Sequence, residues 1–163
     1  MGEELRRTMI TQKFIYKSPI GSLEIISHDG HIKNLNILTD TPPTVGNIIH
    51  PEIESALKQY FQNAKHLFRL RLEPEGSEFQ KKIWQALCQI PVGSVMTYGD
   101  LAKQFGSSPR AIGNACRNNP IPILIPCHRV VAKNHLGGYS GAVDGHYLEM
   151  KKWLLQHEKA YNN

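Results

Sequence analysis

The sequence predicts an α+β protein in which a small antiparallel β-sheet domain with one helix precedes a mainly helical domain that contains a helix-turn-helix. Short runs rich in β-branched and aromatic residues, separated by turn residues, fill positions 10–39. After position 77, apolar residues recur every three to four positions, which is the period of an amphipathic helix. The run Glu73-Pro74-Glu75-Gly76 interrupts both patterns and is typical of a domain boundary. We therefore expect a tail at 1–9, an N-terminal domain at 10–73 and a C-terminal domain at 77–163.

The N-terminal domain is predicted to contain a three-stranded meander, a helix and a fourth strand. The three β-rich runs lie within 14–16, 23–26 and 32–38, and a Ser-Pro-Ile-Gly turn and an Asp-Gly turn separate them. Apolar residues at helical spacing predict a helix over 51–61. In 68–72 a phenylalanine and two leucines alternate with arginines, which predicts the fourth strand.

Two further helices are predicted near the two ends of the C-terminal domain. The first is expected to begin after Ser77, because Gln80 follows three residues later, as in a capping box. Its apolar face is predicted to consist of Phe79, Ile83, Trp84 and Leu87. Cys88 is expected to pack in the core beside that face. The last helix is predicted over 147–157, with Glu158 at its end.

Two short helices between these positions form the predicted helix-turn-helix. Thr97 is expected to cap a helix over 98–105, and Ser107 or Ser108 to cap one that begins at Pro109. On the second helix one face carries two cations with little bulk between them, which suits close approach to a nucleic-acid backbone. The residues of this DNA-facing prediction are Arg110, Ala111, Gly113, Asn114 and Arg117. The alternative is that the small residues only let two helices pack tightly; Cys116 on the same helix is expected to pack.

The charge of the chain is uneven. Residues 77–163 hold ten Lys/Arg and five Asp/Glu, so the whole formal charge of +5 lies in this half, whereas residues 1–76 hold nine of each sign. A polyanionic partner is plausible for the basic half, although an ordinary basic surface has the same composition.

Composition also indicates the compartment. No apolar run reaches the roughly 18 residues of a membrane span, and the N-terminus lacks the apolar stretch of a secretory signal. The three cysteines contain no CxxC pair, which favours a reducing compartment over a disulfide framework or a zinc site. We expect a cytoplasmic protein without a membrane partner or a bound metal.

The stretch from Asn119 to Val131 is the best candidate for chemistry. It is apolar, contains three prolines, and carries Cys127 followed directly by His128. Prolines lack a backbone N–H and disfavour helix, so we expect an extended, stiff segment. A thiol beside an imidazole indicates nucleophilic chemistry, and the alternative is a buried core cysteine. The following Gly-rich loop has backbone N–H groups suited to a ligand oxygen.

These stretches together resemble the methylated-DNA–protein-cysteine methyltransferases (O6-alkylguanine-DNA alkyltransferases). The resemblance is dense over 77–158 and weaker before it. It is carried in chain order by Phe79-Gln80, Trp84, Ile90-Pro91, Gly93, Tyr98, Arg110-Ala111-Ile112-Gly113, Asn119-Pro120, Pro126-Cys127-His128-Arg129-Val130, Gly138-Tyr139-Ser140-Gly141 and Trp153-Leu154-Leu155-x-His157-Glu158. The stretch 142–149 is longer than in relatives, so the resemblance does not predict the wall of the alkyl pocket or the tolerance of bulky alkyl groups. The N-terminal domain lacks the cysteines that hold a structural zinc in some relatives.

The resemblance implies a ribonuclease H-like N-terminal domain and a DNA repair activity by direct damage reversal. Such a protein would bind double-stranded DNA through the minor groove and flip out O6-alkylguanine, or less efficiently O4-alkylthymine. It would transfer the alkyl group irreversibly to its cysteine in a single turnover, as a monomer and without a cofactor. Arg110 matches the residue that fills the gap left by the flipped nucleotide.

The resemblance also implies roles for individual residues. The catalytic set would be Cys127, His128, Glu158, Asn119 and Tyr98, with His128 as the base, oriented by Glu158. The base pocket would be lined by Tyr98, Val130, Tyr139 and Ser140, and Tyr98 would also assist extrusion of the base. Two alternatives stay open from the residues alone: a lesion-binding protein without transfer activity, and a Cys–His hydrolase.

Overall fold

The computed structural model describes residues 11–38, 40, 50–66, 68–139 and 145–159. The chain folds as two compact units, Met1–Glu75 and Gly76–Asn163. No helix in the described ranges is long and apolar enough to cross a lipid bilayer.

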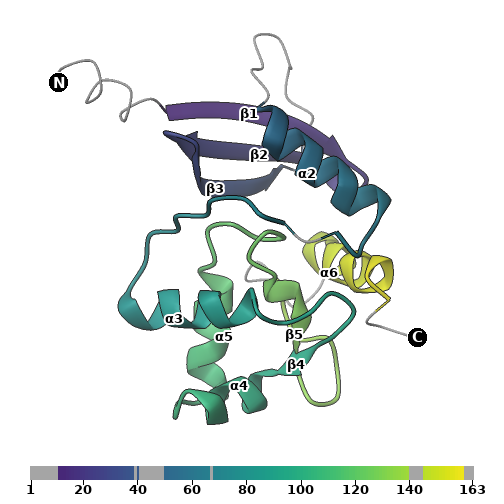
Figure 1. Cartoon of the computed structure of the whole chain (residues 1–163). Coiled ribbons are helices and arrows are strands. Elements are labelled where there is room, and N and C mark those ends of the chain that lie inside the picture. Colours follow the sequence, from purple (N-terminus) through teal and green to yellow (C-terminus); the bar gives the residue numbers. More distant parts are fainter. Residues whose placement is uncertain (1–10, 39, 41–49, 67, 140–144, 160–163) are drawn as a thin grey trace, which may run out of the picture. The chain divides into compact units, whose positions relative to one another are not determined.

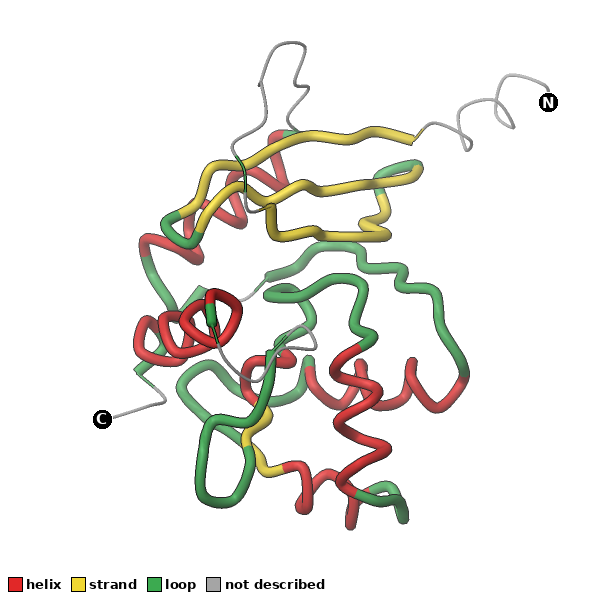
Figure 2. Tube along the Cα trace, turned by 180° about the vertical axis from the view of Figure 1, so that it is seen from behind, coloured by secondary structure: helices red, strands yellow, loops and turns green. Residues whose placement is uncertain are grey.

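The first unit is built on a three-stranded antiparallel sheet. Its strands β1 (Thr11–Ser18), β2 (Gly21–His28) and β3 (His31–Leu38) pair in the order β1-β2-β3, and α2 (Pro51–Gln62) lies across one face (Figures 1 and 2). The side chains that pack between sheet and helix are apolar and almost fully buried: Phe14, Leu23, Ile25, Ile32, Leu35, Ile53, Leu57 and Tyr60. The predicted meander and helix are confirmed. The strands are longer than the apolar runs from which they were predicted.

The predicted fourth strand is wrong. Only Leu72 forms a bridge, parallel to Ile32 of β3. It is held by hydrogen bonds from Ile32 N to Arg71 O (2.8 Å) and from Glu73 N to Ile32 O (2.8 Å). Phe68 packs on the ring of Tyr60 in α2, 5.0 Å between centroids. The first apolar residue of this segment thus packs on the helix, and the segment pairs with the sheet at a single residue rather than as a strand.

In its described residues, the second unit contains four helices and a two-stranded parallel sheet. Its elements are α3 (Glu78–Leu87), β4 (Met96–Thr97), α4 (Tyr98–Gln104), α5 (Pro109–Arg117), a 3-10 turn η1 (Cys127–Arg129), β5 (Val130–Val131) and α6 (His146–His157). Strands β4 and β5 pair with each other. This short sheet joins the start of α4 to the residues that follow Cys127.

The predicted capping box at α3 is confirmed. Ser77 Oγ accepts from Gln80 N (3.1 Å), and Ser77 N donates to Gln80 Oε1 (2.9 Å). Trp84 is buried and its Nε1 donates to Ala115 O (2.8 Å), a carbonyl in the last turn of α5, so this hydrogen bond ties the two helices together.

Two details of α3 differ from the prediction. Phe79 is 37% exposed, because it lies in the first turn before the buried stripe of the helix begins. Cys88 is exposed rather than in the core, because it is the C-cap residue and the helix ends before it can face inward.

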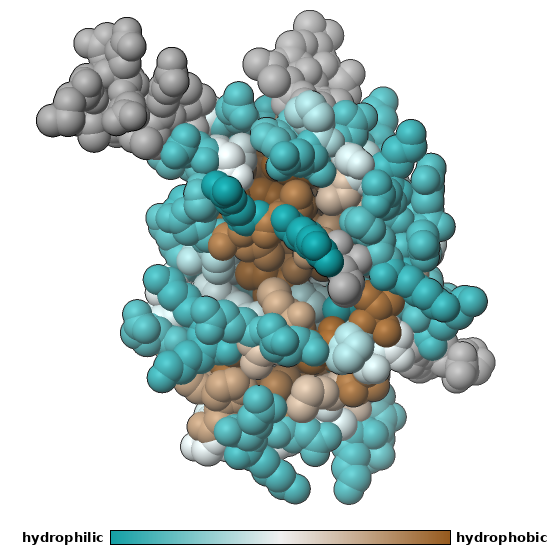
Figure 3. Space-filling model, in the orientation of Figure 1, coloured by the Kyte–Doolittle hydropathy of each residue, from teal (hydrophilic) through white to brown (hydrophobic). Residues whose placement is uncertain are grey.

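Helices α4 and α5 begin at predicted caps. Thr97 Oγ1 accepts from Asp100 N (3.0 Å), and Ser108 Oγ accepts from Ala111 N (3.1 Å). Gly106 ends the turn after α4 with φ +59°, a left-handed conformation that glycine adopts without strain. The two helices contact each other, and polar and apolar surface lie side by side over them in the lower part of Figure 3.

Candidate active site

The segment that carries Cys127 is buried throughout and turns sharply. Every residue from 121 to 130 is buried. Ile125 N donates to Ile121 O (2.9 Å), and Ile123 within this turn has φ +75°, a strained conformation for a β-branched residue. Cys127 then begins the η1 turn, in which Arg129 N donates to Pro126 O (3.0 Å). The expectation of an extended segment at the cysteine is therefore wrong, because a hydrogen-bonded turn follows the last proline.

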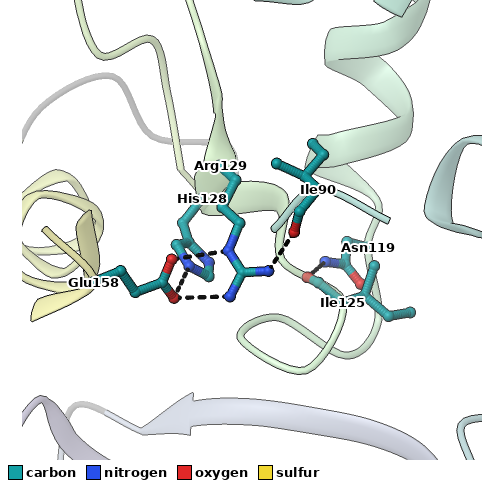
Figure 4. Close-up of polar contacts among 6 residues, drawn as sticks. All are labelled: Ile90, Asn119, Ile125, His128, Arg129 and Glu158. Atoms are coloured by element: carbon teal, nitrogen blue, oxygen red, sulfur yellow. Dashed lines mark hydrogen bonds and ion pairs between the residues drawn. The ribbon is translucent and has the colours of Figure 1, made fainter. Parts of the chain in front are cut away.

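Asn119 holds this turn from inside. Its Nδ2 donates to Ile125 O (2.8 Å), drawn in Figure 4, and its Oδ1 accepts from Ile121 N (2.9 Å). The same side chain hydrogen-bonds to the Cys127 thiol. One amide thus fixes both ends of the turn and contacts the sulfur.

The Cys127 thiol is kept protonated by its surroundings. The residue is 5% exposed, and this burial raises the pKa of the thiol above its ordinary value. The hydrogen bond of Asn119 and the charge of Lys151 act in the opposite direction without cancelling the effect of burial. Because the thiolate is the nucleophile, the sulfur needs a base nearby.

Such a base lies next to it in sequence, and a buried ionic network orients it. His128 Nε2 lies 2.8 Å from Glu158 Oε2, and both side chains are fully buried (Figure 4). Arg129 holds the same carboxylate in a fork, with Nε to Oε1 at 2.8 Å and Nη2 to Oε2 at 3.0 Å, and its Nη1 donates to Ile90 O (2.8 Å). The structure thus brings together His128 and Glu158, which are thirty residues apart in the chain.

The charges in this network favour a neutral imidazole and an ionised carboxylate. Burial lowers the pKa of His128, and the contact with Glu158 offsets this only in part. Burial alone would raise the pKa of Glu158, but His128 and Arg129 together hold it far below its usual range. A neutral His128 donates Nε2–H to the carboxylate, so its Nδ1 carries a lone pair. This Nδ1 is buried and has no hydrogen-bond partner within the described ranges of the chain.

This network predicts that acid destabilises the second unit. The pKa of His128 is lower in the folded protein than in the unfolded chain, so the unfolded chain binds the proton first and stability falls as the pH drops below about 6.5. Glu158 adds a second loss below about pH 4, since its folded pKa is also lowered. Trp84 and Trp153 are the only tryptophans and both belong to this unit, so fluorescence-monitored urea unfolding at a series of pH values measures the effect.

The matched controls are two histidine substitutions. His128→Gln should remove the loss of stability between about pH 6.5 and 5, whereas His146→Gln, at an exposed position, should keep it. A wild-type unfolding free energy that stays constant over this range would contradict the buried neutral imidazole.

A second group of residues forms around Tyr98. Burial raises the pKa of its phenol to about 12, the neighbouring thiols Cys116 and Cys127 add to this, and a backbone hydrogen bond with Gly138 opposes it. Gly137 has φ +78°, and a Cβ atom there would lie 2.9 Å from Tyr98 Cε2. Only glycine allows this backbone to approach the ring so closely.

Two buried cations of the site were not among the predicted site residues. Arg129 is 7% exposed and Lys151 is fully buried. Each stands in an otherwise buried apolar run, Arg129 after 121–127 and Lys151 on the α6 face that also buries Met150, Leu154 and Leu155. A charge at a core position of an amphipathic pattern is the sequence signal that would have found them.

All five predicted DNA-facing residues lie on the outward side of α5. Of the five, Arg110, Asn114 and Arg117 are exposed, and Ala111 and Gly113 are partly exposed. The opposite face of the helix, Ile112, Ala115 and Cys116, is buried. The prediction that Cys116 packs is confirmed. A Cβ added at Gly113 would meet nothing within 4 Å. Tight helix packing therefore does not explain this glycine, and the outward face of α5 is left smooth between two arginines.

The remaining predicted pocket residues are only partly covered by the structure. Val130 and Tyr139 are buried. Ser140 and residues 141–144 lie outside the described residues. Within the described ranges, no group of three or more His, Cys, Asp or Glu side chains is placed to hold a metal ion.

Comparison with known proteins places the chain in a family. The family model described as "6-O-methylguanine DNA methyltransferase, DNA binding domain" matches residues 78–160. The probable methylated-DNA–protein-cysteine methyltransferase of Acanthamoeba polyphaga mimivirus is 38% identical over 148 residues, covering 89% of this chain and 95% of the relative. The constitutive methylated-DNA–protein-cysteine methyltransferase of Bacillus subtilis is 36% identical over 156 residues, covering 88% and 92%.

Comparison with solved structures finds proteins of the same kind as comparison with sequences. The crystal structure of Mycobacterium tuberculosis O6-methylguanine methyltransferase superposes with a TM-score of 0.79 at 32% identity, covering 94% of this chain and 96% of that one. The M. tuberculosis OGT in complex with DNA gives 0.78 at 34% identity, covering 91% and 93%. The α+β class predicted from the sequence is confirmed by this likeness. The chain belongs to the methylated-DNA–protein-cysteine methyltransferase family.

Proposed function

We propose that this protein repairs DNA by moving an alkyl group from the O6 atom of guanine, or less efficiently the O4 atom of thymine, onto Cys127. The observation that carries the proposal is the buried arrangement at the cysteine: a buried thiol followed directly by a buried imidazole that Glu158 orients at 2.8 Å. This is the set of groups that thiolate chemistry needs, and the relatives named above are methyltransferases of this kind.

The thiol proton moves first. His128 Nδ1 is the available acceptor, and a bridging water is the route, because the neighbouring side chains on the η1 turn do not share a hydrogen bond. The imidazolium that forms is stabilised by the Glu158 carboxylate, which Arg129 keeps ionised and in place. The lone pair of Cys127 sulfur then attacks the alkyl carbon.

The carbon–oxygen bond breaks as the carbon–sulfur bond forms. The electron pair of the broken bond stays on guanine O6, and a proton restores neutral guanine. The Tyr98 phenol is the proposed donor, and its raised pKa keeps the proton on the phenol oxygen until the base develops charge. The proton that His128 took from the thiol then returns to the Tyr98 oxygen, so that both side chains end neutral. The product thioether has no hydrolytic exit, so each molecule reacts once, and the reaction requires no cofactor.

The base has to leave the duplex for this geometry, because a buried sulfur is not accessible to a stacked base. We propose that α4 and α5 act as a helix-turn-helix in the minor groove, with the smooth outward face of α5 against the DNA. Arg110, exposed near the start of α5, would fill the gap left by the flipped nucleotide. Arg117 and Asn114 would contact the sugar–phosphate backbone, with Ala111 and Gly113 allowing close approach.

The pocket for the flipped base is proposed between Tyr98 and the residues that follow Cys127. The carbonyls of Cys127 and Val130 would accept hydrogen bonds from the guanine 2-amino group, Tyr139 would line the pocket, and the backbone N–H of Ser140 would bind O6. We further propose a monomeric, cytoplasmic protein whose first unit has a ribonuclease H-like fold.

Titration with damaged DNA tests the function. Duplex oligonucleotide with one O6-methylguanine is added in excess, and we expect lesion loss to stop at one methyl group per protein molecule. Cys127→Ala should lose all transfer, whereas Cys88→Ala, which changes an exposed cysteine, should retain the wild-type endpoint. Repeated turnover would indicate hydrolase chemistry, and tight lesion binding without loss would indicate a lesion-binding protein; either result contradicts the proposal.

A further inference from the structure

Lys151 is a fully buried cation within an apolar face of α6. Its ammonium donates to Val130 O at 2.7 Å and to Gly138 O at 2.8 Å. Burial lowers its pKa to about 8, so it stays mostly charged at neutral pH. A buried ammonium carries a desolvation cost that an apolar side chain at this position would avoid. What the lysine contributes here therefore depends on the two carbonyls that it holds.

The two carbonyls belong to the two segments that border the cysteine and the tyrosine. Val130 lies three residues after Cys127, and its strand β5 pairs with β4, which leads directly into Tyr98. Gly138 adjoins Gly137, whose backbone is packed against the Tyr98 ring. The ammonium itself lies 5.9 Å from the centroid of that ring. Lys151 thus connects α6 to both sides of the proposed base pocket.

We propose that Lys151 is a positioning residue for base recognition, which fixes the direction of the Val130 carbonyl so that it accepts from the 2-amino group of the flipped guanine. This inference rests on the proposed function. A carbonyl oxygen has two lone pairs; the ammonium occupies one and holds the C=O group, and the other is left for the base. The same ammonium, through Gly138, keeps the opposite segment against Tyr98.

Two single-stranded oligonucleotides, in which no base pair has to open, isolate this effect. One contains O6-methylguanine and the other O6-methylhypoxanthine, which lacks the 2-amino group. The readout is the ratio of the two rates of methyl transfer to the protein. We expect the wild type to favour O6-methylguanine, and Lys151→Met to lower this ratio by roughly tenfold, the value of one hydrogen bond. Lys152→Met, the same change at the next residue of α6, should leave the ratio unchanged.

General damage to the site slows both substrates equally and leaves the ratio intact, so an unchanged ratio in Lys151→Met would overturn the inference. A wild type that shows no preference for the 2-amino base would also overturn it. If the wild type transfers no methyl group from either oligonucleotide, the proposed function itself fails, and the two failures are thus distinguishable.

Folding is checked on the same samples. We expect Lys151→Met to keep the wild-type circular dichroism spectrum and to melt at a lower temperature than the wild type, because two carbonyls lose their donor. Lys151→Gln keeps two N–H donors at shorter reach and should retain part of the ratio; it replaces the methionine variant if that variant does not fold. If neither variant folds, the ammonium is required for the fold and the inference is overturned.

Discussion

Replacing Glu158 with glutamine is expected to slow methyl transfer to Cys127 by roughly 100-fold at neutral pH, the usual size of a general-base contribution. The amide keeps the shape of the carboxylate but has no charge to stabilise the His128 imidazolium. In the wild type both carboxylate oxygens accept hydrogen bonds from Arg129, whereas in the variant the amide NH₂ group would replace one of these acceptors. Single-turnover rates on an oligonucleotide with one O6-methylguanine measure the effect. Glu149→Gln, an exposed change on the same helix, should react at the wild-type rate.

The pH dependence separates the loss of a base from a disturbed fold. At alkaline pH the Cys127 thiol ionises without help, so the deficit of Glu158→Gln should shrink as the pH rises. Loss of one partner of a buried ionic network also costs about 3–5 kcal/mol of stability, so fluorescence must confirm that the variant is folded at the assay temperature. A deficit of the same size at every pH would contradict the role of Glu158 in activating the base.

Replacing Arg110 with alanine is expected to slow repair of duplex DNA by about 10- to 100-fold, because extrusion of a base costs a few kcal/mol and the arginine is proposed to offset part of it. In single-stranded DNA no gap in a duplex has to be filled, so the same variant should repair it at nearly the wild-type rate. The measurement is the ratio of single-turnover rates on the two forms of one oligonucleotide.

Two further arginines serve as controls for charge. Arg69→Ala changes an exposed arginine of the first unit and should leave both rates unchanged. Arg117→Ala, on the outward face of α5, should weaken DNA binding and lower the slope of log affinity against log salt by about 1. Equal slowing of duplex and single-stranded repair by Arg110→Ala would contradict its role in extrusion.

Local signals in the sequence predicted local structure well. Ser77 and Gln80 predicted the start of α3, because a capping box needs only residues three positions apart. The cap at Thr97 is local in the same way. The error at 68–72 has the opposite cause: alternation shows which side chains are apolar, and the long-range contact of Phe68 with Tyr60 decides what they cover.

Local sequence signals do not predict the ionic network of the site, because its residues are far apart in the chain. Residue spacing does not predict that Glu158 lies beside His128. The resemblance to the family implies this pairing, and the structure shows it. Arg129 and Lys151 were not predicted as site residues because their partners are distant in sequence. Arg129 pairs with Glu158, 29 residues away, and Lys151 with Val130, 21 residues away. A buried cation at a core position was visible in the pattern, but its partners depend on how α6 meets the turn that carries Cys127.

Peptide mapping by mass spectrometry tests the central claim most directly. The protein is mixed with an equal amount of duplex oligonucleotide that holds one O6-methylguanine, digested, and searched for the methyl group on each of its three cysteines. We predict one methyl group, on Cys127 alone, in an amount equal to the lesion lost. A methyl group on the exposed Cys88 or on the buried Cys116, or loss of the lesion with no methyl group on the protein, would contradict the account.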